Sequence, residues 1–373
     1  MEKSLIESFL QPWYKSLNDP AQTQERVLQG LIEGYRKTRY GRDHGASEVS
    51  NLKDFRERFP LITYQGLKPY LDEVHKGSFE ALLPEQPSAW VMTRGSTGQP
   101  KLIPATKTHL EQIFECGARA FLNYIIKRKD FQLLQGGVLN LNFPSVVGTL
   151  IIKGQSLPYG YSSGTYAKLN PLLSLAKLIP EQEKIDALPP TLTKEDWEKR
   201  FELAYQEAKE KNVVTAMGVT PVITSFGRYI KKRHGVWPKD LWRMRALFCT
   251  SVAKIQVKYA PRLRAFYGKV PVIEMYSATE GVFAQQLNDD PYVSPNYDAY
   301  LLEVETGRGI KMLHEMGRGE WGRLIISSCL FPRYDIGDMI ECAGKNYFRV
   351  FGRAKLRTIL EHQAWRLLAR FFS

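Results

Sequence analysis

The amino-acid sequence predicts a layered α/β fold followed by a smaller, β-rich subdomain. Between residues 137 and 276, short apolar runs typical of strands alternate with longer segments in which apolar residues recur every three or four positions. Strands that alternate with helices pair in parallel, and the helices then cover the sheet in layers. After Tyr276 the helical pattern gives way to short, turn-bounded, strand-like segments, which indicate a β-rich subdomain.

The clearest helix is expected to begin near Lys107. Its apolar side chains recur at steps of three and one from Leu110 to Ile126, which puts them on one helical face. Thr106 or Thr108 can cap its N-terminus. Basic residues stand at its C-terminal end, where the helix dipole favours cations.

The other elements follow in alternation along the chain. Apolar runs predict strands over 137–143, 213–219, 245–251 and 270–276. Helical periodicity predicts helices over 195–211, 221–233 and 255–268. The strands expected in the β-rich subdomain occupy 297–304, 319–328, 338–343 and 346–353.

Size and composition are those of a folded protein. A chain of 373 residues with a hydrophobic fraction of 43% can bury a large core, as one domain with subdomains or as two domains. Lys and Arg outnumber Asp and Glu by 52 to 39, which gives a formal net charge of +13. Such a charge suits nucleic acid, an anionic membrane or a polyanionic small substrate, but the chain has no long basic run. A solvated basic surface is therefore favoured, and neither nucleic acid nor a membrane is predicted as a partner.

The cysteines and the N-terminal residues predict a cytoplasmic location. The four cysteines lie far apart without a CxxC pair, and the six histidines are dispersed, so no zinc site is predicted. The first residues, MEKSLIESFLQPWYKSL, lack the apolar core of a secretory signal. No stretch approaches the roughly 18 apolar residues that cross a bilayer. The oligomeric state is not predicted.

A loop rich in glycine and hydroxyl groups, TRGSTGQPK, occupies residues 93–101. It differs from a Walker loop because Pro100 and Pro104 flank Lys101, and apolar residues follow that lysine. The flanking segments AWVMT and KLIPA predict two strands of a hairpin. The loop is then either an ordinary glycine-rich turn or a tongue whose amides, hydroxyls and lysine close over a polyphosphate.

A second motif, YSATEG, spans residues 276–281 and directly follows a predicted strand. Ligands of α/β sheets bind at the carboxyl ends of the strands, so this position favours a binding site. Tyr276 offers an aromatic plane for a base, Thr279 a hydroxyl for a phosphate, and Glu280 an oxygen ligand for Mg²⁺. Taken alone, such a motif is more often an ordinary turn beside a core tyrosine.

Two further segments carry residues that suit a nucleotide. RYDIGD, residues 333–338, places Asp338 after a glycine that permits a tight turn, and a short carboxylate suits both hydroxyls of a ribose. FGR, residues 351–353, supplies Arg353, which can reach phosphate or ribose oxygens. Each segment alone is weak evidence, but the joint order of all these motifs is far less expected by chance.

The motifs in this order resemble those of the adenylate-forming superfamily of acyl-CoA synthetases, luciferases and peptide-synthetase adenylation domains. TRGSTGQPK resembles its phosphate-binding loop, YSATE its adenylate motif, YDIGD its ribose-binding motif and FGRAK the start of its hinge motif. The wider context, including NLKDFRERFPLITYQGLKPYLDEVHKG, PYGYSSGTYAKLNPL and RYDIGDMIECAG, resembles the Gretchen Hagen family of auxin-responsive acyl-acid amido synthetases. The resemblance covers roughly residues 20 to 353.

This resemblance implies an adenylate-forming N-terminal domain over residues 1–352, with a hinge start and a truncated C-terminal tail over 353–373. It implies an ATP- and Mg²⁺-dependent ligase that joins a carboxylic acid to AMP, releases pyrophosphate, and passes the acyl group to the amine of an amino acid. Catalysis is implied for Lys101, Thr279 and Glu280. The resemblance implies these binding roles: Thr93, Ser96, Thr97 and Lys101 for the β- and γ-phosphates, Thr279 for the α-phosphate, Glu280 for the metal, Tyr276 for adenine, Asp338 for ribose, and Arg353 for ribose or phosphate oxygens. Gly98 is implied to bind the cofactor as well.

The sequence departs from the superfamily pattern in two places. CTSVAK, residues 249–254, lacks the paired glycines that these enzymes commonly place near the base and the acid, so a close backbone approach is less expected. The superfamily continues from the hinge into a C-terminal lid of about a hundred residues, whereas twenty residues follow Arg353 here. These residues predict an apolar, basic helix that packs against the core. We therefore expect a truncated or frame-altered chain of reduced activity.

Three alternatives stay open from the sequence. A lidless chain could be a nucleotide-binding module without turnover, and a thiol such as coenzyme A could replace the amine, as in an acyl-CoA-type ligase. A nucleic-acid-binding protein is suggested only by the net charge, and its affinity would fall steeply with salt. The sequence does not identify the carboxylic acid.

Overall fold

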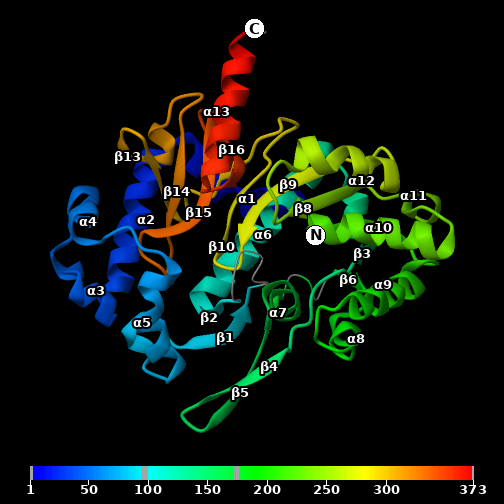
Figure 1. The fold of residues 1–373 in the computed structure, drawn as a ribbon, viewed down its shortest axis with the longest axis horizontal. Coiled ribbons are helices and arrows are strands. Elements are labelled where there is room, and N and C mark those ends of the chain that lie inside the picture. The colour runs from blue at the N-terminus through cyan, green and yellow to red at the C-terminus, as the bar shows by residue number, and fades with distance from the viewer. Residues whose placement is uncertain (1–2, 94–99, 172, 174–175, 372–373) are drawn as a thin grey trace.

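The computed structural model describes residues 3–93, 100–171, 173 and 176–371, which form three sheets and the helices around them (Figure 1). The central sheet has the strand order β11-β10-β9-β8-β7-β3-β6. Its strands from β6 through β3, β7 and β8 to β9 run parallel, as the alternation of strands and helices predicts. The bounds in this sheet are β3 (Gly137–Leu139), β6 (Lys177–Ile179), β7 (Val213–Val219), β8 (Ala246–Thr250), β9 (Val272–Ala278), β10 (Gly281–Gln285) and β11 (Ser294–Pro295).

Helices cover the central sheet on both faces because its strands alternate between two cores. In β8, Leu247 and Cys249 belong to one hydrophobic core together with α9, α10 and α12, whereas Phe248 belongs to the other core together with α6. The helices are α1 (Lys3–Asn18), α2 (Pro20–Tyr35), α3 (Arg39–Asp43), α4 (Leu52–Arg58), α5 (Tyr64–His75), α6 (Lys107–Arg128), α7 (Ser162–Leu169), α8 (Gln182–Asp186), α9 (Lys194–Ala208), α10 (Thr220–His234), α11 (Pro238–Leu241), α12 (Ala260–Tyr267) and α13 (Leu356–Phe371).

The predicted elements of the α/β part are present with shifts of a few residues at their ends, and the helix predicted over 255–268 is a π-helix over Ile255–Tyr259 followed by α12. Helix α6 begins at Lys107, and the Thr106 hydroxyl accepts a hydrogen bond from the His109 amide at 3.2 Å, so Thr106 is the cap. Strand β3 is shorter than predicted. After it, the Asn142 amide donates to the Asn140 side chain at 3.0 Å instead of to a neighbouring strand.

The loop motif at 93–101 connects two strands of a hairpin, as expected. Strands β1 (Pro87–Met92) and β2 (Leu102–Thr106) are antiparallel, with Met92 opposite Leu102. Strand β1 also pairs in parallel with β5 (Gln155–Tyr161), and β5 pairs with β4 (Gly148–Ile152). In Figure 1, β4 and β5 extend away from the body of the molecule.

The predicted β-rich subdomain is an antiparallel sheet with the order β13-β12-β14-β15-β16. The sequence analysis predicted no helices in the N-terminal part of the chain. The N-terminal helices pack against the β-rich subdomain. The side-chain amide of Gln24 in α2 donates to the carbonyls of Tyr297 and Tyr300 at 2.6 and 2.7 Å. The strands are β12 (Leu301–Thr306), β13 (Gly309–Met312), β14 (Trp321–Ser327), β15 (Tyr334–Gly344) and β16 (Tyr347–Arg353).

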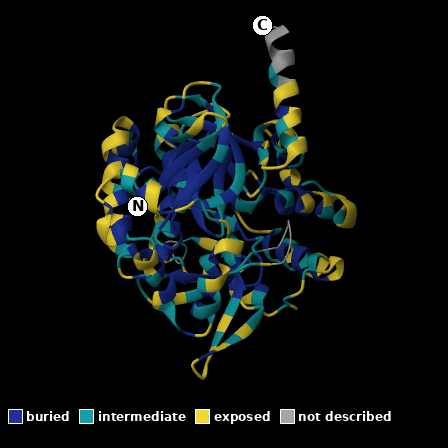
Figure 2. Cartoon of the chain, turned by 60° about the vertical axis from the view of Figure 1, so that its left-hand side comes forward, coloured by how far each residue is buried: buried dark blue, intermediate teal, exposed yellow. Residues whose placement is uncertain are grey.

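Helix α13 extends away from the body, and its described side chains are mostly exposed (Figures 1 and 2). The expected packing of its apolar residues against the core is wrong for Leu356 and Leu360, whose exposed fractions are 73% and 54%. His362 makes the contact instead, because its ring stacks on Phe351 of β16 at 3.8 Å between centroids. Within the described part of the chain, no helix combines the length and apolar character needed to span a membrane.

Candidate active site

A cleft of about 720 Å³ lies at the carboxyl ends of β7, β8 and β9. Three of the residues that the sequence singled out, Ser96, Thr97 and Gly98, lie outside the described residues. The other seven all line this cleft: Thr93, Lys101, Tyr276, Thr279, Glu280, Asp338 and Arg353. The structure therefore brings the separate sequence motifs into one cleft, while the chemical role of each residue stays a prediction.

Lys101 and Glu280 line the cleft and form a compact polar triangle with the buried Tyr334. The Lys101 amine donates to Tyr334 Oη at 2.8 Å and to Glu280 Oε1 at 3.4 Å, and the Tyr334 hydroxyl donates to Glu280 Oε1 at 3.2 Å. The amine also lies 5.1 Å from the centroid of the Tyr64 ring, a cation–π distance. The cleft thus holds one cation and one anion side by side, and the cation lies near the rings of Tyr64 and Tyr334.

The hairpin presents Lys101 through reciprocal contacts with Thr93. The Thr93 amide donates to the Lys101 carbonyl at 2.9 Å, and the Lys101 amide donates to Thr93 Oγ1 at 2.9 Å. These bonds close the base of the loop. The Thr93 hydroxyl keeps its own proton and can still donate it to a ligand oxygen.

Tyr334 was missed by the sequence analysis, although it belongs to the RYDIGD motif. A buried ion pair fixes its place at the start of β15. The Arg333 guanidinium donates to Glu303 Oε2 at 3.0 Å and to the carbonyl of Phe59 at 2.7 Å. Removing either charge of such a pair leaves the other buried and unpaired, which costs several kcal/mol. The available signal was the tyrosine that begins the predicted ribose motif, YDIGD, which is also what a core tyrosine looks like.

Asp338 and Arg353 face each other across strands β15 and β16. Asp338 Oδ1 accepts from Arg353 at 2.9 Å, and Asp338 Oδ2 accepts from the Tyr276 hydroxyl at 2.8 Å. Gly337 has φ +79°, where a residue with a Cβ atom is strained, and a Cβ atom there would lie 2.9 Å from the Arg353 guanidinium and displace it. Burial raises the pKa of Asp338, while the charge of Arg353 and the hydrogen bonds from Tyr276 and Arg353 act in the opposite direction.

The polar groups around Glu280 suit a magnesium ion carried by phosphates. Magnesium commonly takes only one or two protein carboxylates and completes its octahedron with phosphate and water oxygens. Within the described ranges, no three His, Cys, Asp or Glu side chains cluster at metal-binding distance. A lone carboxylate beside a lysine therefore fits Mg²⁺ that arrives with a polyphosphate better than a resident metal.

Comparison with known proteins tests the resemblance directly. A family model described as the GH3 family N-terminal domain matches residues 10–197, which is half of the chain. The chain belongs to the GH3 family. The Gretchen Hagen resemblance in the sequence analysis is therefore confirmed.

Two curated relatives and one solved structure show how far the similarity extends. The probable indole-3-acetic acid-amido synthetase GH3.13 of Oryza sativa subsp. japonica is 37% identical over 102 residues, 25% of this chain and 22% of that protein. The jasmonoyl–L-amino acid synthetase JAR4 of Nicotiana attenuata is 23% identical over 146 residues, 39% of this chain and 25% of that protein. The structure of AtGH3.15 acyl acid amido synthetase in complex with 2,4-DB matches with a TM-score of 0.77 at 16% identity, over 95% of this chain and 71% of that chain.

The structural match confirms the predicted fold class, the α/β fold of the large domain of an adenylate-forming enzyme with its small β-rich subdomain. At 16% identity this likeness concerns the fold alone. The matched segments span a quarter or less of the length of the two curated relatives.

The loop that follows β8 in this GH3 chain has a glycine-like backbone although it contains no glycine. Ser251 has φ +74° and Lys254 has φ +62°, both in the left-handed region, where a Cβ atom costs about 1–2 kcal/mol. Ser251 also lines the cleft. The absence of glycines from CTSVAK therefore leaves two side chains in a backbone conformation that glycine favours.

Replacing Ser251 with glycine is expected to raise the free energy of unfolding by about 0.5–1 kcal/mol, because relief of strain exceeds the added entropy of the unfolded chain. Ser156 in β5 is a matched control, since it is exposed and does not have a positive φ. Ser156→Gly should lower stability by about 0.5–1 kcal/mol. Urea unfolding of both variants measures the two signs, and a loss of stability in Ser251→Gly would contradict strain at this position.

Glu274 also lines the cleft of this GH3 chain and was missed by the sequence analysis. It lies on β9, where its backbone exchanges hydrogen bonds of 2.9 Å with the side chain and the amide of Gln286. Burial alone raises the pKa of its carboxyl to about 7, with no contribution from a charged or hydrogen-bonding partner among the described residues. The signal in the sequence was a single acidic residue inside an apolar strand.

Replacing Glu274 with glutamine should make the stability of the protein less dependent on pH. Between pH 4.5 and about 7 the folded chain keeps a proton that the unfolded chain loses, so the contribution of Glu274 to stability falls as the pH rises through this window. Glu274→Gln is therefore expected to stabilise the fold by about 2 kcal/mol at about pH 8 and by little at about pH 5. Urea unfolding at both pH values measures this difference. Glu210→Gln, at an exposed position after α9, should leave the free energy of unfolding unchanged at both pH values. Equal effects of the two variants would contradict a raised pKa at Glu274.

Proposed function

We propose that this GH3 chain activates a carboxylic acid with MgATP and transfers the acyl group to the amine of an amino acid. The observation that carries the proposal is the convergence of Lys101, Glu280 and Asp338 in one cleft. Residues 1–352 would form the adenylating domain, and residues 353–373 would begin the hinge. A cytoplasmic location belongs to the same proposal and is compatible with the four free cysteines.

The first step joins the carboxylate to the α-phosphorus and breaks the bond to pyrophosphate, which leaves with its negative charges. Lys101 supports this step by placing a positive charge beside the departing phosphates. Glu280 would hold Mg²⁺, which when bound neutralises phosphate charge. The Thr279 hydroxyl donates to Ser162 Oγ at 3.1 Å and would turn to donate to the α-phosphate when ATP binds. No side-chain nucleophile is needed.

The part of the cleft that contains Asp338 and Tyr276 suits the nucleoside. Asp338 now accepts hydrogen bonds from Tyr276 and Arg353 at its two oxygens. A carboxylate has about four acceptor positions, so both oxygens can also accept from ribose hydroxyls. Tyr276 would contact the adenine with the part of its ring that lines the cleft, since Phe283 and Phe348 pack on the rest.

An amine acceptor and an organic acid of the auxin or jasmonate type are proposed from the names of the relatives. These relatives are named as amido synthetases for indole-3-acetic acid and as jasmonoyl–amino acid synthetases. The cleft walls combine aromatic side chains such as Phe143 and Tyr161 with small polar residues such as Ser163, which suits an aryl or alkyl acid.

Pyrophosphate exchange tests the proposal directly. The full chain is incubated with ATP, Mg²⁺, labelled pyrophosphate and single acids, including indole-3-acetate, jasmonate and benzoate. Label is expected to enter ATP with at least one acid, and removal of Mg²⁺ with a chelator should stop it. Exchange with no acid, despite saturable ATP binding by calorimetry, would identify a nucleotide-binding module and overturn the ligase proposal. Product analysis with amino acids or coenzyme A then distinguishes the two acceptor classes.

A further inference from the structure

Helix α7 holds the turn that carries Thr279 and Glu280. The Thr279 hydroxyl donates to Ser162 Oγ at 3.1 Å, and the Tyr166 hydroxyl donates to the Thr279 carbonyl at 2.8 Å. Ser162 and Tyr166 are four residues apart in α7 and therefore lie on the same face of the helix. Because only Thr279 and Glu280 connect β9 to β10, fixing the Thr279 peptide also fixes the direction of the Glu280 side chain.

His109 supports Tyr166 from the core. His109 Nε2 lies 3.0 Å from Tyr166 Oη. Tyr166 has one proton and gives it to the Thr279 carbonyl, so the imidazole must donate through Nε2. Nδ1 is then unprotonated, and it has no hydrogen-bond partner within the described ranges. Burial lowers the pKa of His109 to about 4, which keeps this neutral donor in place near neutral pH.

The same buried residues connect the turn to the phosphate-binding hairpin. The His109 amide donates to the Thr106 hydroxyl at 3.2 Å, and Thr106 ends β2, the strand that follows Lys101. Strand β2 and helix α6 therefore place His109 and Lys101 in one rigid unit. His109 contacts the carbonyl side of the Thr279–Glu280 turn both through Tyr166 and through a hydrogen bond with the Thr279 backbone. Lys101 contacts the Glu280 carboxylate at 3.4 Å.

We propose that Tyr166 and His109 are positioning residues for adenylate formation, an inference that rests on the proposed function. The Tyr166 ring lines the cleft, but its hydroxyl is committed to Thr279. Without that hydroxyl the Thr279–Glu280 peptide can rotate, and both the hydroxyl for the α-phosphate and the carboxylate for Mg²⁺ move. A displacement of about 1 Å in such groups lowers rates by up to about a hundredfold.

Tyr166→Phe removes only the hydroxyl and keeps the ring. It is expected to lower kcat of pyrophosphate exchange by about ten- to a hundredfold and to raise KM for MgATP only by the factor with which Mg²⁺ strengthens ATP binding in the wild type. Tyr229→Phe is the matched control, because the Tyr229 hydroxyl also donates to a protein oxygen, Glu202 Oε2 at 2.7 Å, outside the cleft. It should leave kcat unchanged while lowering the unfolding temperature about as much as Tyr166→Phe does.

Two substitutions at His109 test the role of the donor. His109→Gln keeps an N–H group that can reach Tyr166 and should retain most of the exchange rate. His109→Leu has a similar volume but no donor, and its kcat is expected to fall toward that of Tyr166→Phe. Equal rates in the two variants would show that His109 only fills space, and would overturn its part of the inference.

Calorimetry separates failure of this inference from failure of the proposed function. In the wild-type chain Mg²⁺ should strengthen ATP binding, and Tyr166→Phe should lose this gain while its affinity for ATP without metal is unchanged. If the wild type is active and Tyr166→Phe matches it in exchange and in Mg²⁺ dependence, the positioning role is wrong and the ligase proposal stands. If the wild type binds MgATP without exchange, the positioning role is decided by calorimetry alone: it is wrong if Tyr166→Phe keeps the gain in ATP affinity that Mg²⁺ gives the wild type. A wild type that neither exchanges nor binds MgATP overturns both.

Discussion

Replacing Lys101 with alanine is expected to slow pyrophosphate exchange by about a hundred- to a thousandfold, the range seen when an enzyme loses one electrostatic donor. The Lys101 amine is the positive member of the triangle with Glu280 and the buried Tyr334. Its loss leaves the Glu280 carboxylate facing a polyphosphate without the neighbouring amine. Initial rates at saturating ATP and acid measure this effect.

Two further variants show whether the charge or the fold is responsible. Lys101→Arg keeps the positive charge and should restore part of the rate, though the larger guanidinium cannot reproduce the contacts of a single amine. Lys107→Ala removes an exposed lysine that pairs at 3.8 Å with Glu111 on the surface of α6, and it should leave exchange unchanged. A loss in Lys101→Ala no greater than that in Lys107→Ala would place Lys101 away from the reacting phosphates.

Local sequence patterns were sufficient for the elements that carry the cleft. Thr279 and Glu280 could be placed at the end of a strand because the strand has a clear apolar run and ligands bind where parallel strands end. The hairpin around residues 93–101 could be predicted because its two flanks are short apolar strands. Each of these signals lies within a few residues of the element that it predicts, so it does not depend on the rest of the chain.

The partners of these residues could not be predicted, because they come from distant parts of the chain. Tyr334 is 233 residues from Lys101, and Tyr166 is 113 residues from Thr279. In the sequence both tyrosines look like core residues, since only the topology decides which hydroxyl meets which acceptor. His109 is similar, because a buried histidine at the start of an apolar helix is more often a packing residue.

The same limit explains the expectations that failed. Helical periodicity predicts an apolar face on α13, but whether that face finds a partner depends on the surface beside it, and Leu356 and Leu360 remain exposed. The left-handed backbone of Ser251 could not be predicted from the sequence either, because the surrounding structure imposes it on a residue with a Cβ atom.

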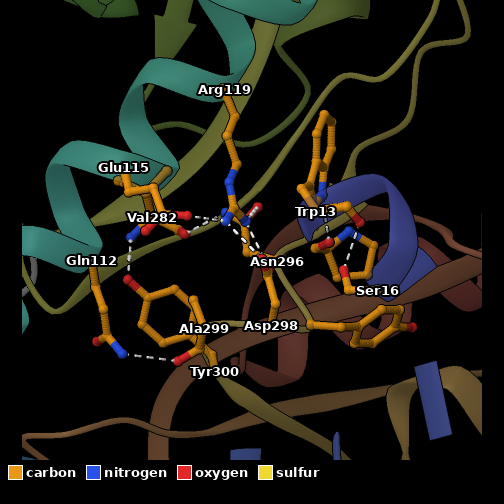
Figure 3. Close-up of polar contacts among 12 residues, drawn as sticks. Trp13, Ser16, Gln112, Glu115, Arg119, Val282, Asn296, Asp298, Ala299 and Tyr300 are labelled. Atoms are coloured by element: carbon orange, nitrogen blue, oxygen red, sulfur yellow. Dashed lines mark hydrogen bonds and ion pairs between the residues drawn. The ribbon is translucent and has the colours of Figure 1, made fainter. Parts of the chain in front are cut away.

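Arg119 of α6 connects the core to the strand that follows the Thr279–Glu280 turn (Figure 3). Its guanidinium donates to both oxygens of Asp298, to Asn296 Oδ1 and to Glu115 Oε1, each at 2.8 Å. Asn296 in turn donates to the carbonyl of Val282 in β10 at 2.7 Å. Because Arg119 is only 1% exposed and Asn296 is buried, the bonds to Asn296 and Asp298 are largely shielded from water and hold β10 in place behind the cleft.

Replacing Arg119 with methionine should lower the free energy of unfolding by about 3 kcal/mol, because the largely buried Asp298 carboxylate loses the guanidinium that donates to both of its oxygens. Asn296 Oδ1 keeps its hydrogen bond from Gln285. Glu115→Gln removes the third charge of the cluster from a side chain that is 48% exposed, and should cost less than about 1 kcal/mol. Urea unfolding of the two variants compares loss of the buried cation with loss of an exposed partner at the same guanidinium. Equal losses would mean that Arg119 contributes no more than a surface ion pair, and that Asn296 holds β10 without it.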